Sequence, residues 1–281
     1  MGLGTVLVRV AETVLPVLPP ALDPLIGAIG GTAAYLLSSG ARRAVRANLA
    51  IIAPHARGEG LTRSVFAWQL RHYLELFRLA HMDHAAIERT VGVVGWEHFQ
   101  AALAGGKGVI ITSGHLGSVS ACGQVVIARG IPVTLPVERD ASAFGQAVNR
   151  ARAAVGLNVV PTDAALGMHR ILKKGGVLGI IADRAVTGVG VRVPFFGRDA
   201  LLPSAAIVLA LRTGAAVVPA FAERHHGRLT TRFEPALEIP RTGDQDADVR
   251  EGVRRFAEAL AARIRLNPAE WSVFEPMWER G

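Results

Sequence analysis

The chain has 281 residues, half of them hydrophobic, and carries a formal net charge of +8 with a pI near 10.8. This length allows one large α/β domain, or two small ones, with a sizeable core. The basic balance fits an anionic membrane surface or phosphate-bearing substrates. Aromatic residues make up only 6% and no zinc-ligand spacing occurs, so we expect no nucleic-acid partner. A single cysteine, Cys122, excludes an internal disulfide and a cysteine metal cluster, and we expect it to be a packed thiol.

The N-terminal 90 residues predict mostly helix. Their start lacks the basic head and apolar body of a cleavable signal peptide. An uncharged, glycine-rich run lies between Asp23 and Arg42, and two more arginines, Arg43 and Arg46, follow it closely. An apolar helix followed by arginines is typical of a segment in the membrane interface. A buried N-terminal helix of a soluble protein would show the same pattern.

An amphipathic helix is predicted over residues 61–82, because apolar side chains recur there every three or four residues. Thr62 suits its N-cap. The recurring positions are Val65, Trp68, Leu70, Leu74, Phe77 and Leu79.

From residue 91 onward, short apolar strands alternate with helices, a pattern typical of a parallel sheet covered by helices. We expect strands near residues 106–115, 131–138, 157–162, 177–184, 215–225 and 228–239, and helices over 144–156, 163–176, 204–214 and 246–268. The sequence therefore predicts an α/β fold with a mainly parallel central sheet flanked by helices. Residues 1–90 form a helical, membrane-associating extension of the same domain, and residues 91–281 form its core.

Three predicted strands end in residues suited to chemistry. His115 follows the strand at 106–115, the pair Glu138–Arg139 ends the next, and the pair Asp183–Arg184 ends the strand at 177–184. Ligands of parallel sheets bind outside the carboxyl ends of the strands. The coincidence of three such ends predicts a site there.

A neutral imidazole such as that of His115 is a suitable general base for a hydroxyl nucleophile. Its other ring nitrogen needs a partner, usually a carboxylate, that selects the tautomer. Nearby arginines suit a phosphate group. The chain has no phosphate-binding glycine loop, no dinucleotide fingerprint and no G-x-S-x-G elbow. The remaining histidines lack ligand spacing, and we expect no metal.

Four segments carry a family resemblance. "SGHLGSVS", "VERDASAFGQAVNRARAAVG", "ADRAVTGVGVRVPFFGRDALLPSAAIVLALRTGAAVVPAF" and "LNPAEWSVFEPMW" occur in this order between residues 113 and 278. Together they resemble the bacterial lipid A biosynthesis acyltransferases, a group similar to lysophospholipid acyltransferases, and most of all the branch that acylates phosphatidylinositol mannosides.

The resemblance implies a peripheral enzyme on the cytoplasmic face of the bacterial plasma membrane, and it makes residues 91–281 the acyltransferase core. Such an enzyme moves a fatty acyl group from a thioester, either acyl-CoA or an acyl-carrier protein, to a hydroxyl of a glycolipid or phospholipid. Membrane lipids, donor and acceptor are its implied partners, and no cofactor is implied. The choice of donor and acceptor, the chain length and the oligomeric state stay open.

The family motif is a histidine, four residues, and then Asp or Glu. His115 matches the histidine, but the acidic position falls on Ser120. Glu138 matches a glutamate that lies beside the reacting groups. Arg152 matches an arginine of the family's active-site groove, and Asp183 and Arg184 match its acidic–basic pair. We expect these residues and Arg139 to bind substrate. Phe195 and Phe196 suit an apolar slot for the acyl chain of the donor, and ordinary core packing is the alternative.

Ser120 leaves three alternatives. The serine oxygen can accept the imidazole N–H bond without stabilising the imidazolium, at a cost of roughly 1–2 kcal/mol, or about five- to thirtyfold in rate. Glu138 or Asp183 can replace the missing carboxylate in space. Finally, the chain can be a noncatalytic homologue that binds lipid or acyl carrier.

Overall fold

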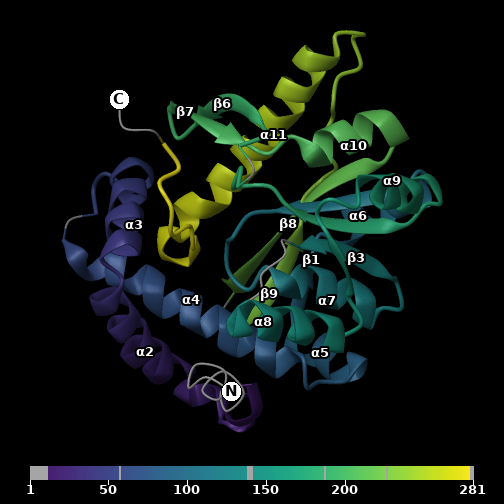
Figure 1. Ribbon diagram of the computed structural model, residues 1–281. Coiled ribbons are helices and arrows are strands. Elements are labelled where there is room, and N and C mark those ends of the chain that lie inside the picture. Colours follow the sequence, from purple (N-terminus) through teal and green to yellow (C-terminus); the bar gives the residue numbers. More distant parts are fainter. Residues whose placement is uncertain (1–11, 57, 138–141, 187, 226, 279–281) are drawn as a thin grey trace.

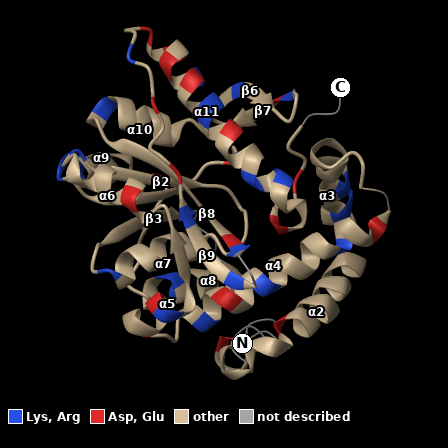
Figure 2. Ribbon diagram, turned by 180° about the vertical axis from the view of Figure 1, so that it is seen from behind, with Lys and Arg blue, Asp and Glu red and all other residues tan. Residues whose placement is uncertain are grey.

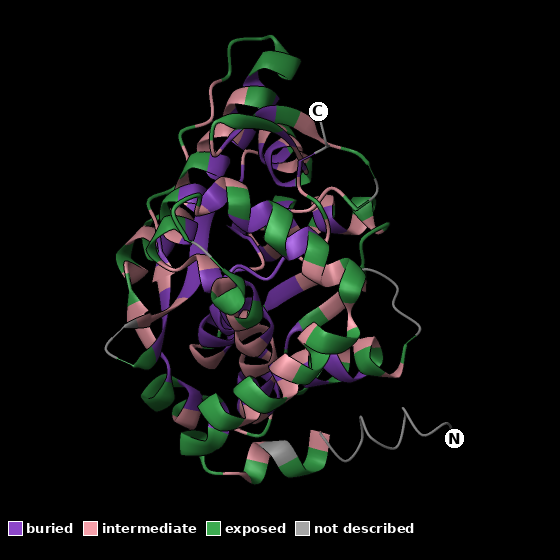
Figure 3. Ribbon diagram, turned by 90° about the vertical axis from the view of Figure 1, so that its left-hand side faces the viewer, coloured by how far each residue is buried: buried purple, intermediate pink, exposed green. Residues whose placement is uncertain are grey.

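The computed structural model of the protein describes residues 12–56, 58–137, 142–186, 188–225 and 227–278. A central sheet is covered by helices on both faces, and the N-terminal helices lie below and beside it (Figure 1). Buried residues concentrate in the strands and the inner helix faces, while exposed residues line the outer helix faces (Figure 3). The expected α/β class is confirmed.

The main sheet has seven strands in the order β1-β9-β8-β2-β5-β3-β4. Neighbouring strands are parallel except β8 and β9, which are antiparallel, so the predicted mainly parallel sheet is confirmed. Its strands are β1 (Gly92–Val94), β2 (Val109–Ser113), β3 (Val133–Val137), β4 (Asn158–Pro161), β5 (Val177–Ile181), β8 (Ala216–His225) and β9 (Arg228–Phe233). Strand β9 is shorter than expected and ends at Phe233, although Glu234 and Leu237 still donate to the Pro219 and Val217 carbonyl oxygens of β8.

The helices form two outer layers. All five residues of β2 are buried, with Val109 and Ile111 on one face and Ile110 on the other, as a strand covered on both sides requires. The layer packed on the first face contains α5 (His84–Thr90), α6 (Trp96–Ala104) and α7 (Ser120–Ala128). The opposite layer contains α9 (Ala165–Lys173), α10 (Ala205–Thr213) and α11 (Gln245–Leu266). Helix α8 (Ala143–Ala154) packs against the N-terminal helices.

Three N-terminal helices pack onto this core: α2 (Asp23–Leu37), α3 (Ser39–Ile52) and α4 (Glu59–Leu79). Helix α2 lies against α4 so closely that a Cβ on Gly31 would come within 2.5 Å of the Ala67 backbone. A buried ion pair between Asp23 and Arg78 fixes the contact, with oxygen–nitrogen distances of 2.6 and 2.8 Å. The chain therefore buries one face of α2 and leaves the other exposed.

No single helix in the described part of the chain is long and apolar enough to cross a membrane. The segments Pro20–Leu37 and Ser39–Ile52 pass such a test only as a pair, and they meet at an angle of 104°. Length and composition alone support this pair.

The start of α4 corrects one expectation. The helix begins at Glu59 after Gly58, whose φ of 83° is open to glycine at little cost. Thr62 lies inside the helix with 2% exposure and is not the N-cap.

A small hairpin, β6 (Val191–Phe195) and β7 (Arg198–Leu202), stands apart from the main sheet. Its two-residue turn places Phe196 at a φ of 52°. Phe195 is buried and packs its ring on Trp271 and Trp278, with centroids 6.0 and 5.7 Å apart. The hairpin therefore closes the core near the C-terminal segment.

Candidate active site

The register of two central strands brings His115 and Asp183 together. Strands β2 and β5 are parallel, and their last paired residues are Ser113 and Ile181. His115 and Asp183 each lie two residues beyond that pair, so both leave the sheet at the same edge. This arrangement confirms that the two strand ends meet.

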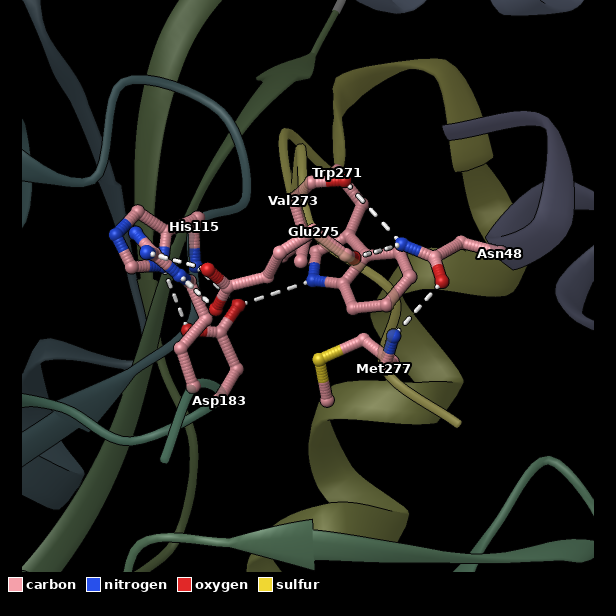
Figure 4. Close-up of polar contacts among 8 residues, drawn as sticks. Asn48, His115, Asp183, Trp271, Val273, Glu275 and Met277 are labelled. Atoms are coloured by element: carbon pink, nitrogen blue, oxygen red, sulfur yellow. Dashed lines mark hydrogen bonds and ion pairs between the residues drawn. The ribbon is translucent and has the colours of Figure 1, made fainter. Parts of the chain in front are cut away.

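Asp183 accepts three hydrogen bonds although its side chain has no solvent exposure. His115 donates twice, from its backbone N–H to Oδ2 and from Nδ1 to Oδ1, both at 2.7 Å. Trp271 donates from Nε1 to Oδ2 at 3.0 Å (Figure 4). Burial by itself raises the pKa of Asp183, but the charge of His115 and these hydrogen bonds lower it below its ordinary value. Asp183 is therefore held as a carboxylate.

This contact decides which nitrogen of His115 is free to act. Because Nδ1–H donates to the carboxylate, Nε2 carries the lone pair. His115 is partly exposed and lines a cavity. The arrangement has the parts of a general base: an accessible nitrogen, a fixed tautomer and a buried anion that stabilises the imidazolium.

The loop that carries His115 is held by the C-terminal segment. Ser272 donates its backbone N–H to the His115 carbonyl oxygen at 2.8 Å, and Gly117 donates to the Glu270 carbonyl oxygen at 3.1 Å. Gly117 has a φ of 61°, and a Cβ there would come within 2.1 Å of the Ala222 carbonyl oxygen. Only glycine fits this turn.

Helix α3 in turn holds the C-terminal segment through Asn48. Its Nδ2 donates to the carbonyl oxygens of Val273 and Glu275 at 3.2 and 2.9 Å, and Met277 donates its N–H to Oδ1 at 3.0 Å. The buried amide thus has three backbone partners (Figure 4). The position of Trp271 beside Asp183 depends on a contact between opposite ends of the chain.

His115 opens onto a cavity of about 270 Å³, which we call the main cavity. Its walls come from α4, the β2–α7 loop, α7, α8 and the C-terminal segment. The lining residues are Gln69, His72, Tyr73, Leu76, Leu79, His115, Gly117, Ser118, Val119, Ser120, Ala121, Gln124, Val148, Arg152, Arg184, Ser272, Phe274 and Glu275. Arg184 forms a bidentate ion pair with Glu275 on this wall, at 2.7 and 3.0 Å.

Ser120 contacts Arg152 and not the imidazole. The Arg152 Nε lies 3.5 Å from Ser120 Oγ, and its Nη1 lies 3.4 Å from Asn149 Oδ1. Burial lowers the pKa of Arg152, against a smaller opposing effect of Tyr73. Arg152 is therefore a buried cation that faces the main cavity.

A second, narrower cavity of about 30 Å³ starts at the same place, and we call it the apolar slot. It shares Val119, Ser120 and Arg152 with the main cavity. Its remaining wall is mostly apolar: Ile111, Ser113, Cys122, Gly123, Val133, Leu135, Leu157, Gly179, Ile180 and Ile181. Cys122 is buried as expected, and burial raises the pKa of its thiol to about 12.

The predicted site residues divide into three groups. His115, Ser120, Arg152 and Arg184 line the main cavity, and Asp183 stands directly behind His115. Phe195 and Phe196 line neither cavity; Phe195 lies in the core, and Phe196 stacks under Arg265. Glu138 and Arg139 lie outside the described residues.

Four further residues of this region were not singled out from the sequence. Trp271, Glu275, His72 and Gln124 touch Asp183 or line the main cavity. A signal existed for His72, which falls on the buried face of the amphipathic helix with Val65 and Leu76.

Comparisons with known proteins show the family of this chain. The family model of the bacterial lipid A biosynthesis acyltransferases matches residues 3–280. The chain is 28% identical over 262 residues to the phosphatidylinositol mannoside acyltransferase of Mycolicibacterium smegmatis, covering 90% of this chain and 84% of that protein. It is 29% identical over 257 residues to the protein of the same name from Mycobacterium tuberculosis, covering 88% and 80%. The match to nearly the whole chain shows that this protein belongs to the bacterial lipid A biosynthesis acyltransferase family.

Proposed function

We propose that this protein transfers a fatty acyl group from a thioester donor to a hydroxyl of a glycolipid, with His115 as the general base. The observation that carries the proposal is the pair of 2.7 Å hydrogen bonds between His115 and the buried Asp183. They supply the carboxylate that Ser120 cannot, so the serine at the motif position does not by itself argue for a noncatalytic protein.

The reaction follows from this pair. As the acceptor hydroxyl oxygen attacks the thioester carbonyl carbon, its proton passes to Nε2 of His115. The imidazolium is stabilised by the Asp183 carboxylate. Collapse of the tetrahedral intermediate breaks the C–S bond, and the imidazolium returns the proton to the departing sulfur. No cofactor or metal is needed, because the thioester is already an activated acyl group.

The developing oxyanion needs hydrogen-bond donors near its position. The Arg152 guanidinium and the first turn of α7, which begins at Ser120, both face the main cavity. The backbone N–H groups of Ala121 and Cys122 in that turn already donate to the carbonyl oxygens of Ser118 and Val119, so the turn contributes the partial positive charge of a helix N-terminus. We assign these groups to the oxyanion, and we assign Arg184 with its partner Glu275 to substrate positioning.

The apolar slot is the proposed place for the acyl chain. It begins beside Ser120 and Arg152, next to the reacting groups, and is walled mostly by aliphatic side chains. Its volume of about 30 Å³ is far smaller than an alkyl chain. Leu135 and Leu157 therefore have to move aside when a donor binds. A Cβ on Gly123 would come within 3.0 Å of Leu157 and one on Gly179 within 3.4 Å of Leu135, so these two leucines fill the space that the glycines leave.

The relatives suggest the acceptor. Both are named phosphatidylinositol mannoside acyltransferases, and a mannosylated phosphatidylinositol is our first choice of acceptor. Its phosphate suits a basic protein with a formal charge of +8.

The outer face of α2 is the proposed membrane contact. Leu22, Leu25, Ile29 and Leu36 are 39–65% exposed and recur at spacings of three, four and seven residues, so they share one side. Asp23 is the only charged residue of α2, which is otherwise uncharged in Figure 2. The arginines of α3 follow directly. Such a helix lies in the interface of an anionic membrane, and cytoplasmic thioester donors place it on the cytoplasmic face.

The test is a transfer assay with the full chain, palmitoyl-CoA or a palmitoylated acyl-carrier protein, and vesicles containing mannosylated phosphatidylinositol. We expect an acylated glycolipid, detected by mass spectrometry, that disappears in His115→Ala. Turnover that survives this substitution would reject His115 as the base. If no donor and acceptor pair gives product while lipid co-purifies with the protein, the noncatalytic binder is the correct alternative.

A further inference from the structure

The main cavity contains two buried side chains whose polar atoms have no hydrogen-bond partner among the described residues. Gln124, on α7, is fully buried, and both its Oε1 and its Nε2 lack a partner. His72, on α4, is 7% exposed, and both ring nitrogens lack one. Most buried polar groups are hydrogen-bonded, and an orphaned group costs stability. These four atoms belong to residues that line the main cavity but have almost no accessible surface themselves, so a ligand in the cavity reaches them once the two side chains turn toward it.

The surroundings of His72 keep it neutral. Burial, and then the charges of Arg224 and Arg71, lower the pKa of His72 to about 3. The nearest carboxylate oxygen, Oε2 of Glu270, lies 3.9 Å from Nε2, which is too far for a direct hydrogen bond. The imidazole therefore offers one donor and one acceptor at the pH of a living cell.

Carboxylates behind this wall disfavour an anion. Glu75 bonds to Ser118 and Arg224 through its two oxygens, so its charge is already paired. Glu270 lies next to His72, and its pKa is raised by burial. Glu270 and Glu75 thus balance the cations Arg71 and Arg224 near His72. A phosphate finds a better site at Arg152, elsewhere on the cavity wall.

The remaining chemistry is that of neutral hydroxyls. A glutamine amide has two donors and an acceptor oxygen, and the neutral imidazole adds one of each. Adjacent hydroxyls on a ring each donate and accept, so they complement this set. We propose that His72 and Gln124 form a subsite that binds the ring hydroxyls of a sugar or cyclitol headgroup, while another hydroxyl of the acceptor reaches His115. This inference rests on the proposed function and identifies the headgroup ring as the part of the acceptor that the cavity recognises.

The test uses two near-isosteric apolar replacements, Gln124→Met and His72→Phe, in the full chain. Each is assayed with palmitoyl-CoA and three acceptors: mannosylated phosphatidylinositol, dodecanol and water. Loss of the hydrogen bonds predicts a rise in KM for the glycolipid of about five- to tenfold per variant. Transfer to dodecanol and hydrolysis by water, which need only the His115 chemistry, should stay within about twofold of wild type.

Thr112→Val is the matched control. Thr112 is 1% exposed, and its Oγ1 also lacks a partner among the described residues, but it does not line the main cavity. We expect this variant to keep the wild-type KM for the glycolipid. An unchanged glycolipid KM in both cavity variants would overturn the inference, and so would an equal loss with dodecanol, which would indicate a structural role.

Direct binding separates this inference from the proposed function. Methyl α-mannoside and myo-inositol are titrated into wild type and Gln124→Met, and saturation-transfer NMR reports contact. We expect wild type to bind at least one of them, which tells sugar from cyclitol, and Gln124→Met to lose it. If wild type catalyses no transfer yet binds the probe, only the proposed function fails; if it binds neither, the subsite is wrong.

Discussion

Two histidines face the same cavity in opposite electrostatic settings. His115 lies at the end of β2 with Nδ1 bonded to the Asp183 carboxylate, whereas His72 lies on α4 with neither ring nitrogen bonded among the described residues. An adjacent anion stabilises an imidazolium, and Asp183 supplies it to His115 alone. Burial, and then the charges of Arg224 and Arg71, disfavour the protonation of His72, although the Glu270 carboxylate lies 3.9 Å from its Nε2. The difference separates a group that can move a proton from one that can only hold a hydroxyl.

The comparison also separates the structural origins of the two walls. The His115 wall is built from strand ends, and its buried carboxylate, Asp183, is bonded to both His115 and Trp271. The His72 wall is built from helix faces and keeps unsatisfied polar atoms in Gln124 and His72. Reacting groups need fixed geometry before the substrate arrives, whereas binding groups can gain their partners from the substrate itself.

The largest expected effect is that of His115→Ala on turnover. Loss of the general base should lower kcat by about 10²- to 10⁴-fold, with the melting temperature little changed because the side chain is partly exposed. Steady-state transfer rates measure it. His84→Ala, at an exposed position on α5, is the control and should retain the wild-type rate. Comparable losses in both variants would remove the distinction between His115 and other histidines.

Asp183→Asn should have the next largest effect on turnover. The amide keeps the shape but cannot stabilise the imidazolium, so kcat should fall about 10- to 10³-fold while the KM of the donor changes little. The split between kcat and KM is the diagnostic reading. A kcat equal to that of wild type would show that Asp183 supports the loop and plays no part in proton transfer.

The exposed face of α2 tests the membrane proposal. Leu25→Ser and Ile29→Ser each remove an apolar contact, and we expect roughly a tenfold loss of binding to anionic vesicles per substitution. Co-sedimentation measures it, with Leu266→Ser on α11, 71% exposed, as the matched control. An equal loss of vesicle binding from the α2 substitutions and from Leu266→Ser would mean that α2 is not a specific membrane contact.

The titration of His72 sharpens the comparison through stability. Its pKa is about 3 in the folded protein and near 6.5 in an unfolded chain. Between these values the unfolded state binds the proton and the folded state does not, so stability falls as the pH falls, by about 1.4 kcal/mol per pH unit at most. The free energy of unfolding, measured with urea from pH 7 to pH 4, should fall less steeply with falling pH in His72→Phe than in wild type. Parallel slopes would contradict a neutral, buried His72.

The smallest effect is expected for Ser120→Asp. Nδ1 of His115 already donates to Asp183, so a carboxylate at position 120 would find no free imidazole N–H to accept. It would pair with Arg152, 3.5 Å from the serine oxygen, and weaken an oxyanion donor. We expect a fall in kcat of about two- to fivefold. A gain in turnover would instead make position 120 the missing acid.

The sequence predicted one wall of the cavity better than the other, for a physical reason. Parallel strands end at a common edge, so His115 and Asp183 could be placed together from strand pattern alone. The sequence could not show that His115 pairs with Asp183 and not with Ser120, because this pairing depends on the register of β2 and β5. The bond from Asn48 to Val273 spans 225 residues of chain and that from Trp271 to Asp183 spans 88, and no local pattern reveals such contacts.

The contacts of Asn48 bear on how this protein can be handled in the laboratory. Its amide joins α3 to the backbone of Val273, Glu275 and Met277. Deleting the apolar N-terminal helices to improve expression would therefore release the C-terminal segment, whose Trp271 holds the Asp183 carboxylate. Screening detergents with the full chain is the better route, because the active site of a truncated chain would lack this support.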